Sequence, residues 1–355
     1  MTPDQRYELV RSMGARDSWW ARVPEPAIHP ELDVIDAHIH FWHPAEIPDP
    51  AQPDRTLRTS KFMNDDFARN IGGHKVAGLV YIECGSGIDI SGDPRFAPVG
   101  ETRFAARLAR DMHDLGHPPI LAIAPFADLR APHLDHLLDA HEQAGGGLVR
   151  AVRQSAALLV DPHARLLAGA ADAGLYHDPA FVQGMATLGA RGLPFEAFQF
   201  HHQLPDLVTL AQQASDTTII VNHLGAPVGY GRGTAHDSQV FDDWHRQITR
   251  LADLPNVVMK LGGLASPVTE YDTAKSATPP SSDEFVAQRG AYFTAAIDAF
   301  GADRCMFESN FPVDSVSISY SVLWNAYKKI ATQYPRAQAA ALLAGTARRI
   351  YGITG

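Results

Sequence analysis

Short apolar runs alternate with helical patterns along most of the chain. The runs are rich in β-branched residues and predict strands, because such residues favour extended backbone. The predicted strands are one that begins at Asp33 and those at Lys75–Cys84, Ile120–Phe126, Gly147–Gln154, Pro194–Phe200, Thr217–His223, Asn256–Leu261 and Arg304–Ser309. The predicted helices are Phe62–Asn70, Thr102–Leu115, His133–Ala144, Pro179–Leu188, Leu204–Ala214, Val240–Ala252, Phe285–Phe300 and a closing pair within Tyr320–Ile350.

Eight strands that alternate with helices favour a parallel sheet buried on both faces. Eight is also the number that closes a (β/α)8 TIM barrel, and a chain of 355 residues suits such a barrel with insertions. An open doubly wound sheet is the alternative, but its glycine-rich phosphate-binding sequence after the first strand is absent. We therefore predict an α/β protein with one TIM-barrel domain at residues 31–355.

An N-terminal arm at residues 1–30 precedes the predicted barrel. It combines a short helix at Thr2–Met13 with an extended part that carries Trp19 and Trp20. Long polar loops follow the first, sixth and seventh strands, and the loops after helices are shorter. This asymmetry is expected if the site lies at the carboxyl-terminal face of the barrel. The long loops are His43–Arg58, Gly225–Asp243 and Ser266–Asp283.

The composition limits the classes of function. A formal net charge of −10 argues against a nucleic-acid partner, which normally requires a clustered basic face. Cys84 and Cys305 are too few for a disulfide framework, and a reducing compartment suits them. The first twenty residues carry charges throughout, and no apolar run approaches the length that crosses a bilayer. We expect a cytoplasmic protein.

A His-x-His pair follows the first predicted strand. Side chains two residues apart on a strand point to the same face, so Asp36, His38 and His40 are expected to line up. Two imidazoles at this spacing can hold one divalent metal ion from a rigid backbone. The alternative is a chance pair in a chain that has 17 histidines.

Polar residues also end the other predicted strands. Because these ends converge in a barrel, the set is more informative than any member. Alternation predicts that Gln199 and His201 face the lumen, while Phe198 faces the helices and His202 the solvent. His223 is a candidate ligand or general acid/base, or a structural histidine. The strand-end residues are Glu83, Asp128, Arg153, His201, His223, Lys260, Glu308 and Asn310.

Two strand ends admit alternative interpretations. Arg153 is positioned to clamp a substrate carboxylate or a developing oxyanion, or else to form an internal ion pair with Glu83 or Glu308. Asn310 cannot accept a proton at neutral pH. Glu308 is then the nearest carboxylate able to deprotonate a water, and Asp314 is expected to serve as a helix cap or turn residue.

Five segments resemble the amidohydrolase superfamily, specifically its amidohydrolase-2 branch of TIM barrels. They are Asp36–Trp42, Val221–Gly225, Val258–Leu264, Met306–Asp314 and Gly345–Tyr351. The branch includes sugar-lactone and pyrone-lactone hydrolases and non-oxidative decarboxylases, so the resemblance implies a TIM barrel but no single substrate.

The resemblance also implies roles for individual residues. His38 and His40 match the metal ligands on the first strand, and His201 matches the ligand after the fifth. His223 matches a histidine that binds or shuttles protons. Asn310 stands where most members have an aspartate that serves as ligand and base.

The leading prediction is a hydrolase that opens a lactone bearing a carboxylate or hydroxyls. His38, His40 and His201 would hold Zn²⁺ or a similar ion. Glu308 or His223 would take the proton, with Arg153 and Glu83 binding the substrate.

The sequence also allows other mechanisms and functions. In a metal-free version the same histidines donate hydrogen bonds to the carbonyl. A decarboxylase on the same scaffold is one alternative, and a metabolite-binding barrel without chemistry, suggested by Asn310, is another. A homodimer through the outer helices is possible, with exposed Trp19 and Trp20 contributing.

Overall fold

The structure is a computed structural model in which part of the chain is described. The described residues are 16–43, 47–49, 52–58, 61–158, 171–228, 238–266, 269, 271, 273 and 276–353. The helix predicted at Thr2–Met13 lies outside them. Parts of the three long predicted loops also lie outside them.

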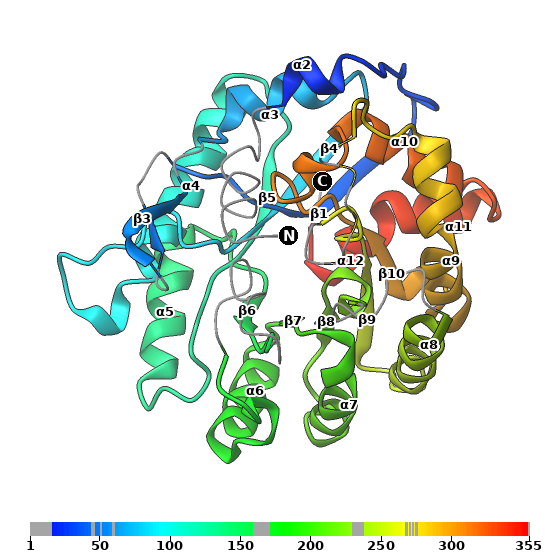
Figure 1. The fold of residues 1–355 in the computed structure, drawn as a ribbon. Helices are drawn as coiled ribbons and strands as arrows, with labels where there is room; N and C mark the ends of the chain where they lie inside the picture. Colours follow the sequence, from blue (N-terminus) through cyan, green and yellow to red (C-terminus); the bar gives the residue numbers. More distant parts are fainter. Residues whose placement is uncertain are drawn as a thin grey trace.

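Parallel strands form a closed barrel within the described residues (Figure 1). One sheet has the order β1-β4-β5 and another the order β10-β9-β8-β7-β6. Parallel bridges close both seams, Ile39 with Phe311 on one side and Ile123 with Val149 on the other. The predicted TIM barrel is therefore confirmed. The strands are β1 (Asp33–Ile39), β4 (Lys75–Ile82), β5 (Ile120–Ala124), β6 (Val152–Ser155), β7 (Phe195–Phe198), β8 (Ile219–Val221), β9 (Val257–Leu261) and β10 (Cys305–Phe307).

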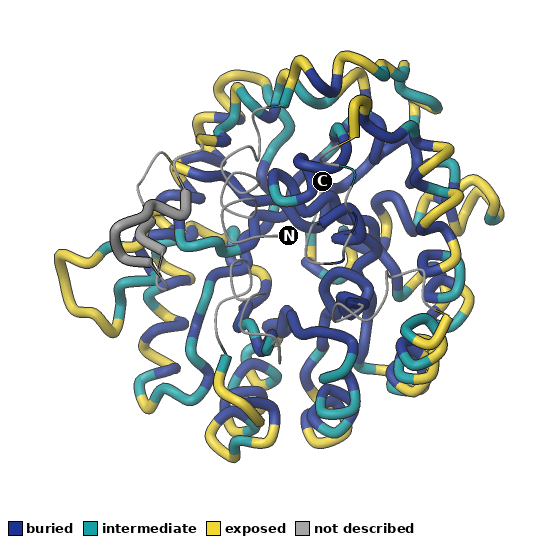
Figure 2. Tube along the Cα trace, viewed as in Figure 1, coloured by how far each residue is buried: buried dark blue, intermediate teal, exposed yellow. Residues whose placement is uncertain are grey.

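Helices surround the barrel and expose their outer faces, whereas the strands are buried (Figures 1 and 2). Local sequence sets their ends. Helix α6 starts after Asp178, whose side chain accepts a hydrogen bond from Ala180, and ends at Gly192, which is left-handed with φ 66°. The helices are α2 (Asp17–Trp20), α3 (Asn64–Asn70), α4 (Val99–Asp114), α5 (Leu134–Gly145), α6 (Pro179–Arg191), α7 (Leu204–Gln213), α8 (Ser238–Ala252), α9 (Ser282–Phe300), α10 (Tyr320–Ala331), α11 (Arg336–Ala340) and α12 (Thr346–Ile350).

The inside of the barrel forms an apolar cluster of its own. It contains inward-facing residues of the strands together with Ala344, Ala347 and Tyr351 from the C-terminal segment. Small side chains such as Ala122, Ala124 and Ala151 keep this interior narrow. The polar residues of the site therefore stand on a packed floor.

The described part of the N-terminal arm is anchored on the barrel. Helix α2 carries Trp19 and Trp20, which are buried at 7% and 6% exposure. Their indole N–H groups donate to the carbonyls of Ser276 and Ser315, at 3.0 Å in each case. The expectation that these tryptophans are exposed was wrong, because both rings are buried against the barrel and hydrogen-bonded to it.

Part of the first predicted loop is regular structure. Strands β2 (Ile47–Asp49) and β3 (Gln52–Arg58) pair antiparallel there. A membrane-spanning helix is not found among the residues that the structure describes.

Candidate active site

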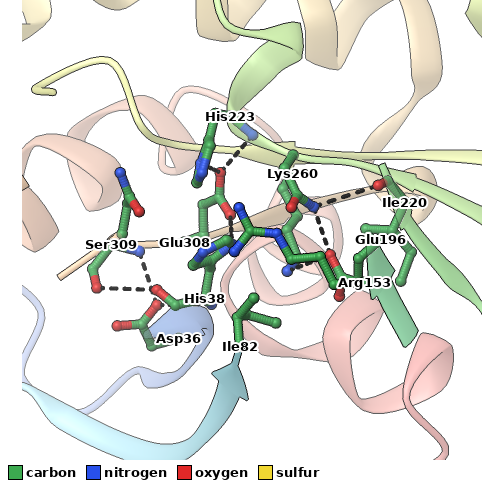
Figure 3. A network of polar contacts seen from close by, with 12 residues as sticks. Asp36, His38, Ile82, Arg153, Glu196, Ile220, His223, Lys260, Glu308 and Ser309 are labelled. Carbon is green, nitrogen blue, oxygen red and sulfur yellow. Dashed lines mark hydrogen bonds and ion pairs between the residues drawn. The ribbon is translucent and has the colours of Figure 1, made fainter. Parts of the chain in front are cut away.

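Three ionisable side chains meet at the carboxyl-terminal ends of the barrel strands (Figure 3). His38 lies on β1, His223 follows β8 and Glu308 follows β10. Glu308 Oε1 accepts from His223 Nδ1 at 2.7 Å and from the His223 backbone N–H at 2.8 Å. Glu308 Oε2 lies 3.0 Å from His38 Nδ1. Because Glu308 is fully buried, these imidazoles are fixed by a carboxylate that solvent does not reach.

Two glycines allow these groups to approach. A Cβ at Gly262 would lie 2.4 Å from Glu308 Cγ, and a Cβ at Gly263 would lie 2.5 Å from His223 Cβ. Gly263 also has a φ of +69°, which other residues rarely adopt. His223 itself is left-handed, with φ 56°, at the start of the 3₁₀ helix η5 (His223–Gly225). In the sequence this glycine pair lies within the segment Val258–Leu264, and no signal there indicated its role.

His40 adds a second imidazole contact to His38. Its Nδ1 lies 2.9 Å from the Ile82 carbonyl, which can only accept, so Nδ1 carries the proton and Nε2 a lone pair. That Nε2 lies 3.1 Å from Nε2 of His38. Nδ1 of His38 and Oε2 of Glu308 lie 3.0 Å apart, but neither atom has a hydrogen-bond partner among the described residues. Imidazole nitrogens beside a buried, unsatisfied carboxylate oxygen are ligands that divalent metal ions accept, so the donor set fits such an ion.

The pKa shifts indicate which of His38 and Glu308 carries a charge. Burial lowers the pKa of His38 well below its ordinary value, and the charge of Lys260 lowers it further, so the ring is neutral. Burial alone would raise the pKa of Glu308, but the charge and hydrogen bonds of His223, with Lys260, hold it below its ordinary value. Glu308 is therefore an ionised carboxylate and a weak base, better suited to orienting His223 than to taking the proton itself.

Arg153 forms the internal ion pair that was one of its two interpretations. Its Nε lies 3.6 Å from Glu83 Oε1, and its Nη1 donates to the Glu83 carbonyl at 3.3 Å. The guanidinium lies over the Phe198 ring at 5.2 Å, and that ring meets His223 edge-on, also at 5.2 Å. Arg153, Phe198 and His223 thus form one side of the site, with Arg153 extended toward His38 and Glu308 (Figure 3).

The predicted side of the fifth strand was wrong. Phe198 faces the site, whereas Gln199 accepts a hydrogen bond from Tyr176 in the 3₁₀ helix η3 (Leu175–His177), which packs outside the strand. Strand β7 ends at Phe198, and His201 begins the 3₁₀ helix η4 (His201–Gln203), so strand alternation does not extend to it. His202 is half-buried beside the Leu158 carbonyl rather than exposed.

The structure does not gather the expected ligand set His38, His40 and His201. Among the described residues, the one group of three whose ligand atoms lie within 4.8 Å of each other is His38, His223 and Glu308. Nδ1 of His201 accepts from the Val228 backbone N–H at 3.1 Å.

The side chains of Asn310 and Asp36 form hydrogen bonds with Asp314 and Tyr320. Asn310 lies beside β1, where its N–H donates to the His38 carbonyl at 3.0 Å, and its Nδ2 donates to Asp314 Oδ1 at 2.8 Å. Asp36 does not line up with the histidines. It binds Tyr320 of α10 and the Ser309 backbone N–H, because the β1 register shifts between Asp36 and Ile39.

A buried ion pair lies below the site and was not predicted. Lys260 Nζ lies 2.8 Å from Glu196 Oε2, and both side chains are fully buried. Asn222 and Tyr351 donate to the same carboxylate. Glu196 precedes Phe198 by two residues on β7, so correct alternation would have revealed it on the inner face.

A TIM barrel with imidazoles and a carboxylate at its strand ends is typical of hydrolases whose site lies at the carboxyl-terminal face. The amidohydrolase family model matches residues 35–353, and the chain belongs to this family. It is 30% identical over 332 residues to an uncharacterized protein, y4mH, of Sinorhizobium fredii, which covers 91% of this chain and 99% of the relative.

Two further relatives carry informative names. An L-fucono-1,5-lactonase of Burkholderia multivorans is 27% identical, over 90% of this chain and 96% of its own length. A solved structure of an amidohydrolase from the same species with bound Zn has a TM-score of 0.69 at 23% identity, and covers 90% of this chain and 99% of its own. At that identity the solved structure supports the shared fold alone.

Proposed function

We propose that the protein is a lactonase that opens an uncharged, hydroxylated lactone by hydrolysis. The observation that carries the proposal is the His223–Glu308 pair beside the His38–His40 imidazoles. A histidine oriented by a buried carboxylate is suited to act as a general base on water. The likeness to an L-fucono-1,5-lactonase favours a lactone as the electrophile.

Each residue has a role in this scheme. Glu308 accepts from His223 Nδ1 and leaves Nε2 of the same ring to take a proton from the attacking water. The protonated ring then returns this proton to the leaving ring oxygen as the C–O bond breaks. Arg153 donates to the substrate carbonyl or a hydroxyl, with Glu83 holding the guanidinium in place.

The donor set assigns a place to a divalent cation. His38 and His40 would hold it through the Nε2 atoms that face each other, and we propose Zn²⁺ because an amidohydrolase of Burkholderia multivorans has been solved with bound Zn. When bound, such an ion polarises a carbonyl and lowers the pKa of a water. His201 remains a proposed further ligand, and Asn310 a proposed neutral hydrogen-bonding group that lines the site.

Charge balance favours an uncharged substrate. Within the described part of the site, each basic side chain already has an acidic partner, Glu83 for Arg153 and Glu196 for Lys260. Glu308 adds a further negative charge. A substrate carboxylate placed here would compete with these acids for the same cations, which disfavours both the carboxylate-bearing lactone and a decarboxylation of an aromatic acid.

A substrate panel tests the proposal. Purified protein with added Zn²⁺ would be assayed against neutral sugar lactones, a dicarboxylated pyrone and a dihydroxybenzoate. Ring opening is followed by acid release and decarboxylation by CO₂. We expect ring opening of a neutral lactone and none of the other reactions. Release of CO₂ would favour the decarboxylase instead, and no turnover on any substrate would favour a binding barrel.

A further inference from the structure

The loop after β4 wraps around a buried carboxylate that the proposed reaction does not use. Glu101 lies in the first turn of α4 and is 3% exposed. Its Oε1 accepts from the backbone N–H groups of Cys84 at 2.8 Å and Ser86 at 3.0 Å, and its Oε2 accepts from Gly85 at 3.1 Å. The Tyr81 hydroxyl donates to Oε1 at 2.9 Å.

Three successive N–H groups that converge on one anion form a backbone cradle of the kind that usually binds phosphate or another ligand. Gly85 has a φ of +79°, which permits the turn that aims the three groups inward. Here the anion is supplied by the chain itself. Burial and the nearby charge of Glu83 raise the pKa of Glu101 to about 7, and the hydrogen bonds from Cys84, Ser86 and Tyr81 oppose that rise.

The cradle begins one residue after Glu83. Both contacts from this strand end to Arg153 come from Glu83, one from its carboxylate and one from its carbonyl. The Glu83 carbonyl belongs to the peptide unit whose N–H, on Cys84, donates to Glu101. Because a peptide unit is planar, the bond that fixes this N–H also fixes the direction of the carbonyl that holds Arg153.

We propose that Glu101 is a positioning residue that sets the place of Arg153 through the loop Glu83–Ser86. The hydrogen bonds of Glu101 come from Tyr81 and from the loop Glu83–Ser86, so it acts on Arg153 through this loop. The proposal rests on the proposed function in one respect, namely that Arg153 binds the substrate.

The test compares Glu101→Gln with Thr102→Val. The glutamine keeps the shape of the side chain but places an NH₂ group against the Gly85 N–H. The matched control changes the next residue of the same helix and removes a buried hydrogen bond, at 2.8 Å, from Thr102 to His141 on another face. We expect E101Q to raise KM about two- to tenfold, as one lost hydrogen bond would, with kcat within about twofold, and T102V to leave both unchanged.

A double-mutant cycle with Arg153→Ala identifies the path of the effect. If Glu101 acts through Arg153, E101Q changes KM by less than about 1.5-fold once Arg153 is absent. An undiminished effect in the R153A background would overturn the proposal, as would an equal effect of T102V in the native background.

Crystal structures of the native protein and of E101Q give a readout that does not depend on turnover. We expect loop Glu83–Ser86 and the Arg153 guanidinium to move together in E101Q, and an unmoved guanidinium would overturn the proposal. If the native protein opens no lactone while Arg153 moves, the proposed function fails and the positioning role stands.

Discussion

Substitution of Glu308 by glutamine tests the proposed cation site. Oε2 of Glu308 is buried without a hydrogen-bond partner among the described residues, and it lies 3.0 Å from Nδ1 of His38. The negative charge of Glu308 therefore favours a cation bound at the His38–His40 pair. In E308Q this charge is lost and a neutral amide takes its place.

The size of the effect follows from the loss of this charge. Zinc at about 100 times its dissociation constant would stabilise the native protein by about 2.7 kcal/mol, or about 4 °C in Tm for a chain of 355 residues. In E308Q the site lacks its carboxylate and binds zinc more weakly, so we expect a shift below about 1 °C under the same conditions.

Thermal unfolding with EDTA and then with Zn²⁺ provides the assay. Glu196→Gln is the matched control, because it also replaces a buried carboxylate of the barrel that is paired with a cation. E196Q should keep the zinc-induced shift of the native protein. An equal zinc-induced shift in Tm in E308Q and the native protein would show that Glu308 does not favour cation binding.

Two further predictions concern stability. Gly263→Ala adds a Cβ 2.5 Å from His223 at a φ of +69°, so we expect the free energy of unfolding to fall by about 1–2 kcal/mol from the backbone strain alone, with a large fall in kcat. Gly116→Ala, at φ +68° with nothing within 4 Å, is the control and should show the same strain without the loss of activity. Urea unfolding and steady-state kinetics of both variants measure the difference. Burial lowers the pKa of His141 to about 4, against an ordinary value of 6.5. Because the unfolded chain takes up this proton first, the free energy of unfolding is highest above pH 6.5 and falls by about 3 kcal/mol as pH drops from 6.5 to about 4. His141→Gln should therefore flatten the pH dependence of unfolding between pH 6.5 and 4, and an unchanged slope would contradict this assignment.

The barrel could be predicted from sequence because it depends on a repeated pattern. Each apolar run needs cover on both faces, and helices between the runs supply that cover. Strand ends in such a barrel converge whatever their loops do. This is why His38, His223 and Glu308 could be expected to meet, as they do within 4.8 Å.

Other features of the site depend on local backbone that periodicity does not describe. The prediction for Gln199 failed because its face of the strand was assigned to the lumen, whereas Glu196 and Phe198 share the inner face. The prediction for Asp36 failed at a register shift. The bond from Asn310 to Asp314 and the cradle around Glu101 are set by turns, in which side-chain direction follows each φ value rather than a period. The side-chain directions at these turns could therefore not be predicted from the hydrophobic pattern.

The rate of lactone opening by His223→Asn tests the central claim most directly. Asparagine can still donate to Glu308 but has no basic nitrogen to accept a proton from water. We expect kcat to fall by about 100-fold or more while the variant remains folded. A kcat within about threefold of the native value, on a lactone that the native protein opens, would contradict that claim.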